Sequence, residues 1–372
     1  MALFIGAMSG TSLDGVDAVL VETTLEAAAA PLVERGFVHL PMPKALRAEL
    51  LALNRSGDDE VHRGALAANA VARLYADAVS QLLAASDVST TRVQAIGAHG
   101  QTVRHRPGEF DGTGYTVQLL NGALLAELSS IDVVCDMRSR DLAAGGQGAP
   151  LVPAFHAACF ASPHENIAVL NLGGISNLTL LPAEGAVRGF DCGPGNVLMD
   201  LWCQQRLGAS HDAGGARAGH GQVDAVLLAS ALADPYFARQ PPKSTGRDLF
   251  DPAWLARWAG STPLADEDAL ATLAEVTARS AIDAVQTFAP RTARLLVCGG
   301  GAFNAHLMQR LATLAGPAVS VATTVTAGIA PDKVEALAFA WLAREFSARR
   351  RGSLETVTGA RGARLLGALY PA

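Results

Sequence analysis

The chain has 372 residues, half of them hydrophobic and 17% charged, with a formal net charge of −6 at pH 7. This length predicts about two domains with a sizeable core, and the acidic balance argues against non-specific binding to nucleic acid or to an anionic membrane surface. Five cysteines without a CxxC pair, no signal-peptide pattern and no long apolar run free of charge, Gly or Pro predict a reduced, cytoplasmic α/β protein.

The first half opens on a predicted β-hairpin. An apolar strand, Leu3–Ala7, enters the turn "MSGTSLDGV", and a second strand, Asp17–Glu22, leaves it. Ala-rich sequence over residues 63–86 predicts a long helix. A strand then ends in "VQAIGAHGQTV", and the segment "VVCDMRSRDLAAGGQGAPLV" follows.

The second half opens in the same way. Strands Ile167–Asn171 and Asn177–Leu181 flank the turn "LGGIS". A further strand is expected to stop at Asp191, within the stretch "GFDCGPGN", and a helical pattern follows this stretch. A polar stretch over 208–222, the loop "QPPKSTGRDLFDP" and a long helix near 268–288 come next. The strand in "ARLLVCGGGAFN" leads into a helix from about His306, and a last helix is predicted over Val334–Phe346. Strands alternating with helices favour an α/β fold.

Glycine-rich turns occupy matching places in the two halves. A hairpin tip without Cβ atoms lets backbone N–H groups approach a phosphate, although either tip alone is equally consistent with a purely conformational role. The third glycine loop, "VCGGGAFN", has neither the GxGxxG spacing of a dinucleotide fold nor the GxxxxGK[ST] spacing of a Walker A loop. Three contiguous glycines still leave room for an adenosine against the backbone.

This arrangement resembles the superfamily of sugar kinases, Hsp70 chaperones and actin, and more narrowly the anhydro-N-acetylmuramic acid kinase family. The resemblance spans essentially the whole chain. Its carriers are "MSGTSLDGVD", "GAHGQTVRHRP", "DMRSRDLAAGGQGAPLVP", "NLGGISNLT", "FDCGPGN", "PPKSTGRDLF", "CGGGAFN" and "GIAPDKVEALAFAWLA". One departure is Cys192, where the family pattern has Thr, which is expected to alter local hydrogen bonding without removing the chemistry.

The resemblance implies an α/β fold of two ribonuclease-H-like (actin/hexokinase-type) domains flanking an ATP cleft. The first domain is expected over 1–160 with the tail 347–372 packed back on it, and the second over 161–346. The implied reaction uses ATP and Mg²⁺ to phosphorylate the anhydro amino sugar while water opens its ring. N-acetylmuramic acid 6-phosphate and ADP are its products in cell-wall recycling, and the implied state is a cytoplasmic homodimer without nucleic-acid or membrane partners.

Two carboxylates are the predicted catalytic groups. Asp191 corresponds to the family's general base, against the alternative of an Asx-turn that bonds its own backbone. Asn196 is expected to cap the helix that follows, which leaves Asp191 free. Glu335 corresponds to the family's second water-binding carboxylate, against the alternative of a capping box with Asp332.

Nucleotide contacts are expected in all three glycine loops. The predicted residues are Gly10, Thr11, Ser12, Leu13, Asp14, Gly15, Val16, Asp17, Asn171, Gly173, Gly174, Gly299, Gly300, Gly301 and Asn304. Asp14 or Asp17 is expected to hold Mg²⁺ through water, because Mg²⁺ keeps most of its waters in such sites; Asp14 is the preferred one.

Sugar contacts are expected from the first half. Arg138 suits bidentate recognition of a carboxylate, with a surface salt bridge as the equal alternative. Gln101, Thr102 and His99 follow a strand and face sugar hydroxyls in this interpretation, although a single His is more often structural. Lys243 and Arg247 form a cationic loop, for which a mobile, solvated loop is slightly favoured over a substrate clamp.

Alternative functions remain on the same fold. One is a kinase for another sugar or acid. Another is an ATPase chaperone or actin-like filament protein, for which 372 residues leave little room beyond two ATP-binding halves. A third, a catalytically silent sugar-binding regulator, is disfavoured by Asp191 and Glu335.

Overall fold

The computed structural model describes residues 1–27, 30–246, 249–260 and 264–372. Two compact units divide the chain: the first comprises Met1–Cys159 and Glu335–Ala372, and the second Phe160–Val334. The predicted boundary after residue 160 lies next to this division. The predicted second domain also included helix α11 (Val334–Ser347), whereas nearly all of this helix belongs to the first unit.

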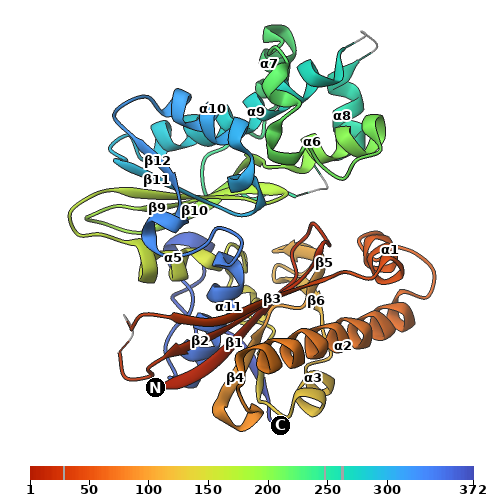
Figure 1. Cartoon of the computed structure of the whole chain (residues 1–372), viewed down its shortest axis with the longest axis vertical. Helices are drawn as coiled ribbons and strands as arrows, with labels where there is room; N and C mark the ends of the chain where they lie inside the picture. The colour runs from red at the N-terminus through yellow and green to blue at the C-terminus, as the bar shows by residue number, and fades with distance from the viewer. Residues whose placement is uncertain (28–29, 247–248, 261–263) are drawn as a thin grey trace. The chain divides into compact units, whose positions relative to one another are not determined.

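A mixed six-stranded sheet forms the centre of the first unit (Figure 1). Its strand order is β13-β7-β4-β1-β2-β3. Strand β2 runs antiparallel to β1 and β3, whereas β4 runs parallel to β1 and β7 parallel to β4. The strands are β1 (Ala2–Met8), β2 (Gly15–Thr23), β3 (Val33–Pro41), β4 (Val93–Ala98), β7 (Val133–Cys135) and β13 (Ala368–Tyr370), and a separate hairpin contains β5 (Gln101–Pro107) and β6 (Gly114–Leu119).

Glycines explain why α11 belongs to the first unit. A Cβ on Gly6 in β1 would lie 1.9 Å from the carbonyl oxygen of Ala336, and a Cβ on Gly97 in β4 would lie 2.0 Å from that of Phe339. The helix backbone therefore rests directly on the two central strands. Such a close approach requires glycine, and nothing in the local sequence of α11 specifies which sheet it contacts.

The opposite face of this sheet carries the long helix α2 (Glu60–Ser86). Alternate strand residues point to opposite faces, so Ile5 and Ile96, which neighbour the two glycines, pack in one cluster with Tyr75 and Leu82 of α2. The sheet is thus covered on both faces. The other helical segments of this unit are α1 (Lys44–Ala52), η1 (Thr90–Arg92), α3 (Gly122–Ser129), α4 (Ser139–Ala143), α5 (Val152–Phe160) and α12 (Glu355–Thr358).

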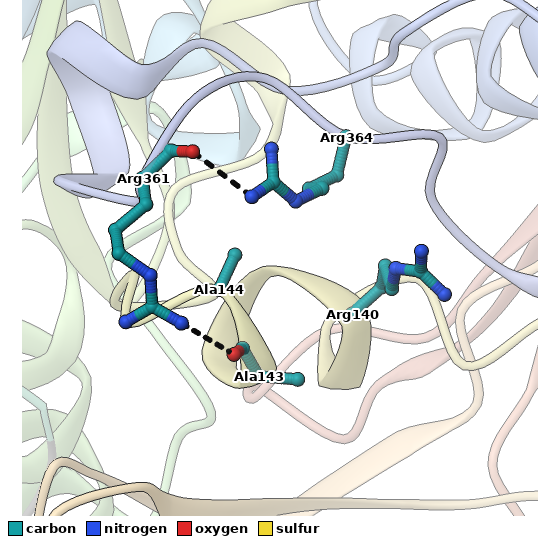
Figure 2. Close-up of a pocket in the computed structure, with 5 residues that line it drawn as sticks. All are labelled: Arg140, Ala143, Ala144, Arg361 and Arg364. Carbon is teal, nitrogen blue, oxygen red and sulfur yellow. Dashed lines mark hydrogen bonds between the residues drawn. The ribbon is translucent and has the colours of Figure 1, made fainter.

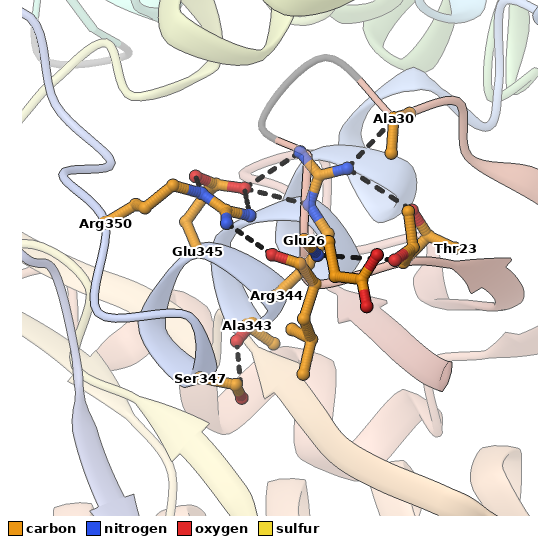
Figure 3. Close-up of polar contacts among 10 residues, drawn as sticks. Thr23, Glu26, Ala30, Ala343, Arg344, Glu345, Ser347 and Arg350 are labelled. Carbon is orange, nitrogen blue, oxygen red and sulfur yellow. Dashed lines mark hydrogen bonds and ion pairs between the residues drawn. The ribbon is translucent and has the colours of Figure 1, made fainter. Parts of the chain in front are cut away.

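A buried ion-pair network fixes the end of α11 (Figure 3). The Arg344 side chain is fully buried, and its guanidinium donates to Glu345 at 2.8 Å, to the Thr23 hydroxyl at 3.3 Å and to the Ala30 carbonyl at 2.9 Å. Arg350 also donates to the Glu345 carboxylate, at 2.6 and 2.8 Å. Glu345 is therefore the shared counter-charge of two arginines.

The second unit repeats the strand order of the first, except that it has no counterpart of the edge strand β13. Its sheet runs β10-β9-β8-β11-β12, with β9 antiparallel to β8 and β10, and with β11 parallel to β8 and β12. Two units with one strand order and one pattern of directions confirm the predicted pair of ribonuclease-H-like domains. The strands are β8 (Ile167–Leu172), β9 (Ile175–Leu181), β10 (Arg188–Pro194), β11 (Arg294–Cys298) and β12 (Ser320–Thr323).

Helix α9 (Asp266–Phe288) forms the centre of the second core. Its buried residues occur all around the helix, as expected for a helix enclosed on every side, and they share one cluster with Trp202, Trp254 and Trp258. Among the described residues, no helix combines the length and apolar character that crossing a bilayer requires. The other helical segments are α6 (Val197–Trp202), η2 (Cys203–Leu207), η3 (Ala213–Gly215), η4 (Ala218–His220), α7 (Ala225–Leu232), α8 (Pro252–Ala259), η5 (Gly300–Phe303), α10 (Ala305–Ala315) and η6 (Thr324–Ala327).

Candidate active site

The first glycine loop joins β1 to β2 in the first unit. Its tip is a tight turn in which the Leu13 N–H donates to the Gly10 carbonyl at 3.2 Å, and Leu13 adopts a φ of +57°. Gly15 permits the neighbouring strand to approach, because a Cβ there would lie 2.3 Å from the Leu40 carbonyl oxygen. The backbone of the predicted phosphate loop is therefore fixed on both sides of the exposed Thr11.

The two acidic residues of this loop have different surroundings. Asp14 is exposed, and its Oδ1 accepts from the Ser12 hydroxyl and from the Gly15 N–H, both at 2.9 Å. Asp17 contacts His39 Nδ1 of β3 at 2.7 Å. The carboxylate of Asp14 is thus oriented at the tip, whereas that of Asp17 is engaged by the neighbouring strand.

A histidine connects this loop to Arg138. The buried His99 donates from Nδ1 to the Ser9 carbonyl at 3.2 Å, and its Nε2 accepts from the Arg138 guanidinium at 2.9 Å. Arg138 also donates to the Gly148 carbonyl at 2.8 Å. Burial, followed by the positive charge of Arg138, lowers the pKa of His99 to about 3. Both ring nitrogens of His99 therefore serve to orient the loop and the arginine.

Neutral buried histidines make stability depend on pH. The pKa values of His99 and His156 are lowered to about 3 and that of His105 to about 4, mainly by burial, whereas an unfolded chain takes up these protons near pH 6.5. The contribution of these neutral histidines to the free energy of unfolding is expected to be complete above about pH 6.5. It should fall by about 1.4 kcal/mol per pH unit for each histidine as the pH drops toward 4.

Urea unfolding at pH 7 and pH 5 measures this effect. The variant His99→Asn is expected to lose less stability between the two pH values than the parent chain. The variant His62→Asn, at an exposed position of α2, should match the parent. An equal loss in all three proteins would contradict the assignment of a neutral His99.

Gln101 lies beside the same loop with one polar atom unused. Its Nε2 donates to the Gly10 carbonyl at 3.2 Å, whereas its Oε1 is buried and has no hydrogen-bond partner among the described residues. A buried unpaired carbonyl is costly unless a ligand or water satisfies it. The Thr102 hydroxyl accepts from Gln118 at 3.1 Å. All four predicted sugar contacts thus lie in the first unit, and Gln101 has an acceptor available.

The loop that holds Arg138 is supported by residues that sequence reasoning missed. Asp141 is fully buried, and its carboxylate accepts from the Gly148 N–H and from the Thr358 hydroxyl, both at 2.8 Å. Gly146 lies so close that a Cβ would be 2.2 Å from this carboxylate. Thr358 is 217 positions from Asp141, so no local signal could have paired the two.

In the second unit, one asparagine brings the other two glycine loops together. Asn196 donates from its side chain to the Leu172 carbonyl at 3.1 Å and from its backbone to the Gly173 carbonyl at 2.8 Å. Its amide also lies 3.1 Å from where a Cβ of Gly301 would stand. The prediction that this side chain caps helix α6 is therefore wrong: no side-chain cap bond forms, because the amide is turned toward the glycine hairpin.

The third glycine loop joins β11 to α10. Gly299 has a φ of +80°, and its N–H donates to the Pro331 carbonyl at 2.9 Å. A Cβ on Gly299 would lie 2.5 Å from Asn171 Oδ1, so the end of β8 and this loop are packed together. Asn304, predicted to contact nucleotide, accepts from the Leu307 N–H at 2.9 Å and caps α10.

Asp191 lies inside a strand and not at its end. Strand β10 continues to Pro194 across a bulge between Asp191 and Gly193, which corrects the predicted stop. The half-buried Asp191 carboxylate accepts from the Thr245 N–H at 3.0 Å, and the Tyr236 hydroxyl donates to the Asp191 carbonyl at 2.7 Å. A bond to a residue 54 positions away is a long-range contact, unlike the local bond of an Asx-turn.

Two residues near Asp191, Lys243 and Thr245, differ from the sequence-based expectation. Lys243, predicted in a solvated loop, is half-buried; its ammonium lies 4.9 Å from the Tyr236 ring centroid and donates to the Phe237 carbonyl at 3.3 Å. Arg247 lies outside the described residues. The Thr245 hydroxyl is buried without a partner among the described residues, so a second unused polar group stands beside the predicted base.

Cys192 fills the bulge next to the predicted base. Its buried thiol donates to the Ser176 hydroxyl at 3.2 Å, and burial raises its pKa to about 12. The thiol is therefore neutral at pH 7 and hydrogen-bonded within the core.

Glu335 is the first residue after the chain passes from the second unit back into the first. It is half-buried and is the second residue of α11, directly after the point where the chain leaves the second unit. A capping box needs its Glu three residues after the cap, and the helix begins at Val334. Asp332 lies three residues before Glu335, so the capping box remains the alternative to the predicted role.

Comparison with known proteins gives a full-length match. The family model described as anhydro-N-acetylmuramic acid kinase matches residues 2–372. A curated relative of that name from Variovorax paradoxus is 58% identical over 376 residues, which covers 100% of this chain and 99% of the relative. A second from Bordetella petrii is also 58% identical, covering 100% and 96%. Among solved structures, a ROK family glucokinase from Streptomyces griseus aligns over 92% of this chain and 100% of its own at 13% identity with a TM-score of 0.42.

Proposed function

Because this chain belongs to the anhydro-N-acetylmuramic acid kinase family and is therefore a kinase of that sugar, we propose how its residues divide the reaction. Water attacks the anomeric carbon C1 and gives up a proton, the bond from C1 to O6 breaks, and O6 takes the γ-phosphoryl group of ATP. The products are N-acetylmuramic acid 6-phosphate, ADP and one proton. The reaction belongs to cell-wall recycling.

Asp191 is the proposed general base. A half-buried carboxylate that accepts from the Thr245 N–H at 3.0 Å keeps a fixed direction, which suits a general base. Thr245, whose N–H binds this carboxylate, also has a buried hydroxyl without a partner among the described residues. This hydroxyl can hydrogen-bond a water or a sugar hydroxyl. This pair of groups is the observation that carries the proposal.

Glu335 is the proposed second carboxylate for the water. Its place in the first turn of α11, half-buried, leaves its side chain near the helix N-terminus, where the unpaired N–H groups favour a negative charge. The family correspondence supplies the role itself.

ATP phosphates are proposed to contact the loop from Gly10 to Asp17 and the hairpin Gly173–Gly174, with adenosine at Gly299–Gly301. The fixed turn at Leu13 and the close packing of Gly299 on Asn171 support preformed loops. The oriented, exposed carboxylate of Asp14 suits a hydrated Mg²⁺. When bound, that ion neutralises phosphate charge during transfer.

The sugar is proposed to contact Gln101 and Arg138. The unpaired Oε1 of Gln101 accepts a hydrogen bond from a sugar hydroxyl. The guanidinium of Arg138, held by His99 and Gly148, faces the carboxylate of the lactyl arm. His99 positions Arg138 without touching the sugar.

A cytoplasmic homodimer completes the proposal. None of the five cysteines, all of which lie in the described residues, forms a disulfide, and four of them are buried, which suits a reducing compartment. Light scattering after gel filtration tests the dimer: a mass near twice 38.4 kDa supports it, and a mass near the single value overturns it.

Mass spectrometry of the reaction mixture tests the function. With ATP, Mg²⁺ and the anhydro sugar, we expect a product heavier by one phosphoryl group and one water, and no product without ATP. N-acetylmuramic acid, which lacks the bridge, and glucose are the comparison substrates. Faster turnover of either one would favour a kinase for another sugar, and ATP hydrolysis without any sugar product would favour an ATPase of the chaperone or actin type.

A further inference from the structure

A pocket rich in arginine lies in the first unit, and none of its lining residues is assigned to the reaction. It has a volume of about 280 Å³ and lies between α4 and the chain segment after α12. Figure 2 shows the Arg361 and Arg140 side chains on opposite sides of it, with Arg364 above the two alanines. The lining residues are Arg140, Ala143, Ala144, Arg361 and Arg364.

None of the three arginines forms an ion pair with a described residue. Other arginines of the chain do: Arg310 pairs with Glu275 and Arg344 with Glu345. Three like charges around one pocket repel each other, and the repulsion grows where water is partly excluded. In a chain with a net charge of −6, such an uncompensated positive group favours an anion from solution.

Backbone carbonyls hold two of the guanidinium groups without neutralising them. Arg364 donates to the carbonyls of Gly362 and Arg361, both at 2.9 Å, and Arg361 donates to that of Ala143 at 3.3 Å. Gly145 lets Arg361 approach, because a Cβ there would lie 2.9 Å from its Nη1. Donors that are already oriented lose little freedom when they bind a ligand.

An acidic group of this region is engaged by the backbone. Glu355 in α12 is exposed, and its carboxylate accepts from the Ala363 N–H at 3.0 Å. It therefore fixes the backbone of the arginine segment and forms no ion pair with Arg361 or Arg364 among the described contacts.

We propose that this pocket binds a phosphate group, as inorganic phosphate or as a small phosphomonoester. Guanidinium forks match the oxygens of phosphate with paired hydrogen bonds. The two alanines leave the space for a compact, multiply charged anion. A bound phosphate would join α4 to the segment 361–364.

That junction also supports the loop that holds Arg138. The Arg361 N–H donates to the Ala144 carbonyl at 2.9 Å, and the Gln147 N–H donates to the Thr358 carbonyl at 2.8 Å. Phosphate in the pocket therefore stabilises the folded chain by mass action. It also holds α4 and the segment 361–364 together.

The test measures phosphate binding by calorimetry on the full chain at constant ionic strength. The proteins are the parent, the double variant Arg361→Gln/Arg364→Gln, and Arg73→Gln as the control, because Arg73 is exposed on α2. We expect each lost pocket arginine to weaken binding about tenfold, with Arg73→Gln unchanged. Phosphate that binds at the nucleotide loops would bind all three proteins alike, so the difference isolates the pocket.

Equal phosphate affinity in the three proteins would overturn the proposal. The proposal would also be overturned if sodium chloride, at the same ionic strength, raised the melting temperature of the parent chain as much as phosphate does. Glucose 6-phosphate is the phosphomonoester probe: tighter binding than inorganic phosphate identifies a phosphorylated metabolite as the source, and weaker binding identifies the free anion. Should the double variant not fold, Arg140→Gln replaces it, because Arg140 is exposed and has no described hydrogen bond to lose.

Discussion

The variant Asp191→Asn is expected to lower kcat by about 10²- to 10⁴-fold, the usual contribution of a general base. Asparagine keeps the size of the side chain, and its carbonyl oxygen can still accept the hydrogen bond from the Thr245 N–H. It cannot take a proton from water. The affinity for ATP and for the sugar should therefore change little while the chemical step slows.

A matched control separates this effect from a general one. Asp283→Asn makes the same chemical change at an exposed position of α9 and should leave kcat and melting temperature unaltered. A folded Asp191→Asn protein with near-parent kcat would show that the base lies elsewhere and that the carboxylate serves only the contact with Thr245.

The variant Glu345→Gln is expected to lower the free energy of unfolding by about 3–5 kcal/mol, the cost of removing one member of a buried ion pair. Glu345 is 3% exposed, and Arg344, fully buried, keeps its charge after the change. The Thr23 hydroxyl and the Ala30 carbonyl, which also accept from Arg344 (Figure 3), are neutral and cannot replace the carboxylate. Arg350 loses the same counter-charge.

Chemical denaturation of the variant measures this loss, with Glu127→Gln at an exposed position of α3 as the control. The control should unfold with the parent. A loss below about 1 kcal/mol for Glu345→Gln, as for a surface pair, would contradict a structural role for the network and point to water or another carboxylate near Arg344.

Local signals explain which parts of the fold were predictable. The hairpins around both glycine loops, the helix of residues 60–86 and the helix after Val334 follow from periodicity and turn residues within short windows. Strand β3, mostly exposed or half-buried, and the four-residue strand β12 carry no such pattern and were missed. The unit to which α11 belongs depends on glycines far away in β1 and β4, which a local pattern cannot reveal.

The candidate site divides in the same way. The glycine loops and Asp191 could be located because a turn or a family motif marks them. The groups that orient them could not, because each contact joins distant positions: Thr245 with Asp191, and Thr358 with Asp141. Asn196 illustrates the limit, since its sequence context indicates a helix cap, whereas the fold uses its amide to join two glycine loops.

Turnover in ¹⁸O-enriched water tests the central claim most directly, because it follows the oxygen that the proposed base activates. Mass spectrometry of the product should place the label on C1 of the sugar and leave the phosphoryl group unlabelled, since O6 of the sugar attacks phosphorus. Label in the phosphoryl group, or in released inorganic phosphate without a labelled sugar, would mean that water attacks ATP and would contradict a ring opening coupled to phosphorylation.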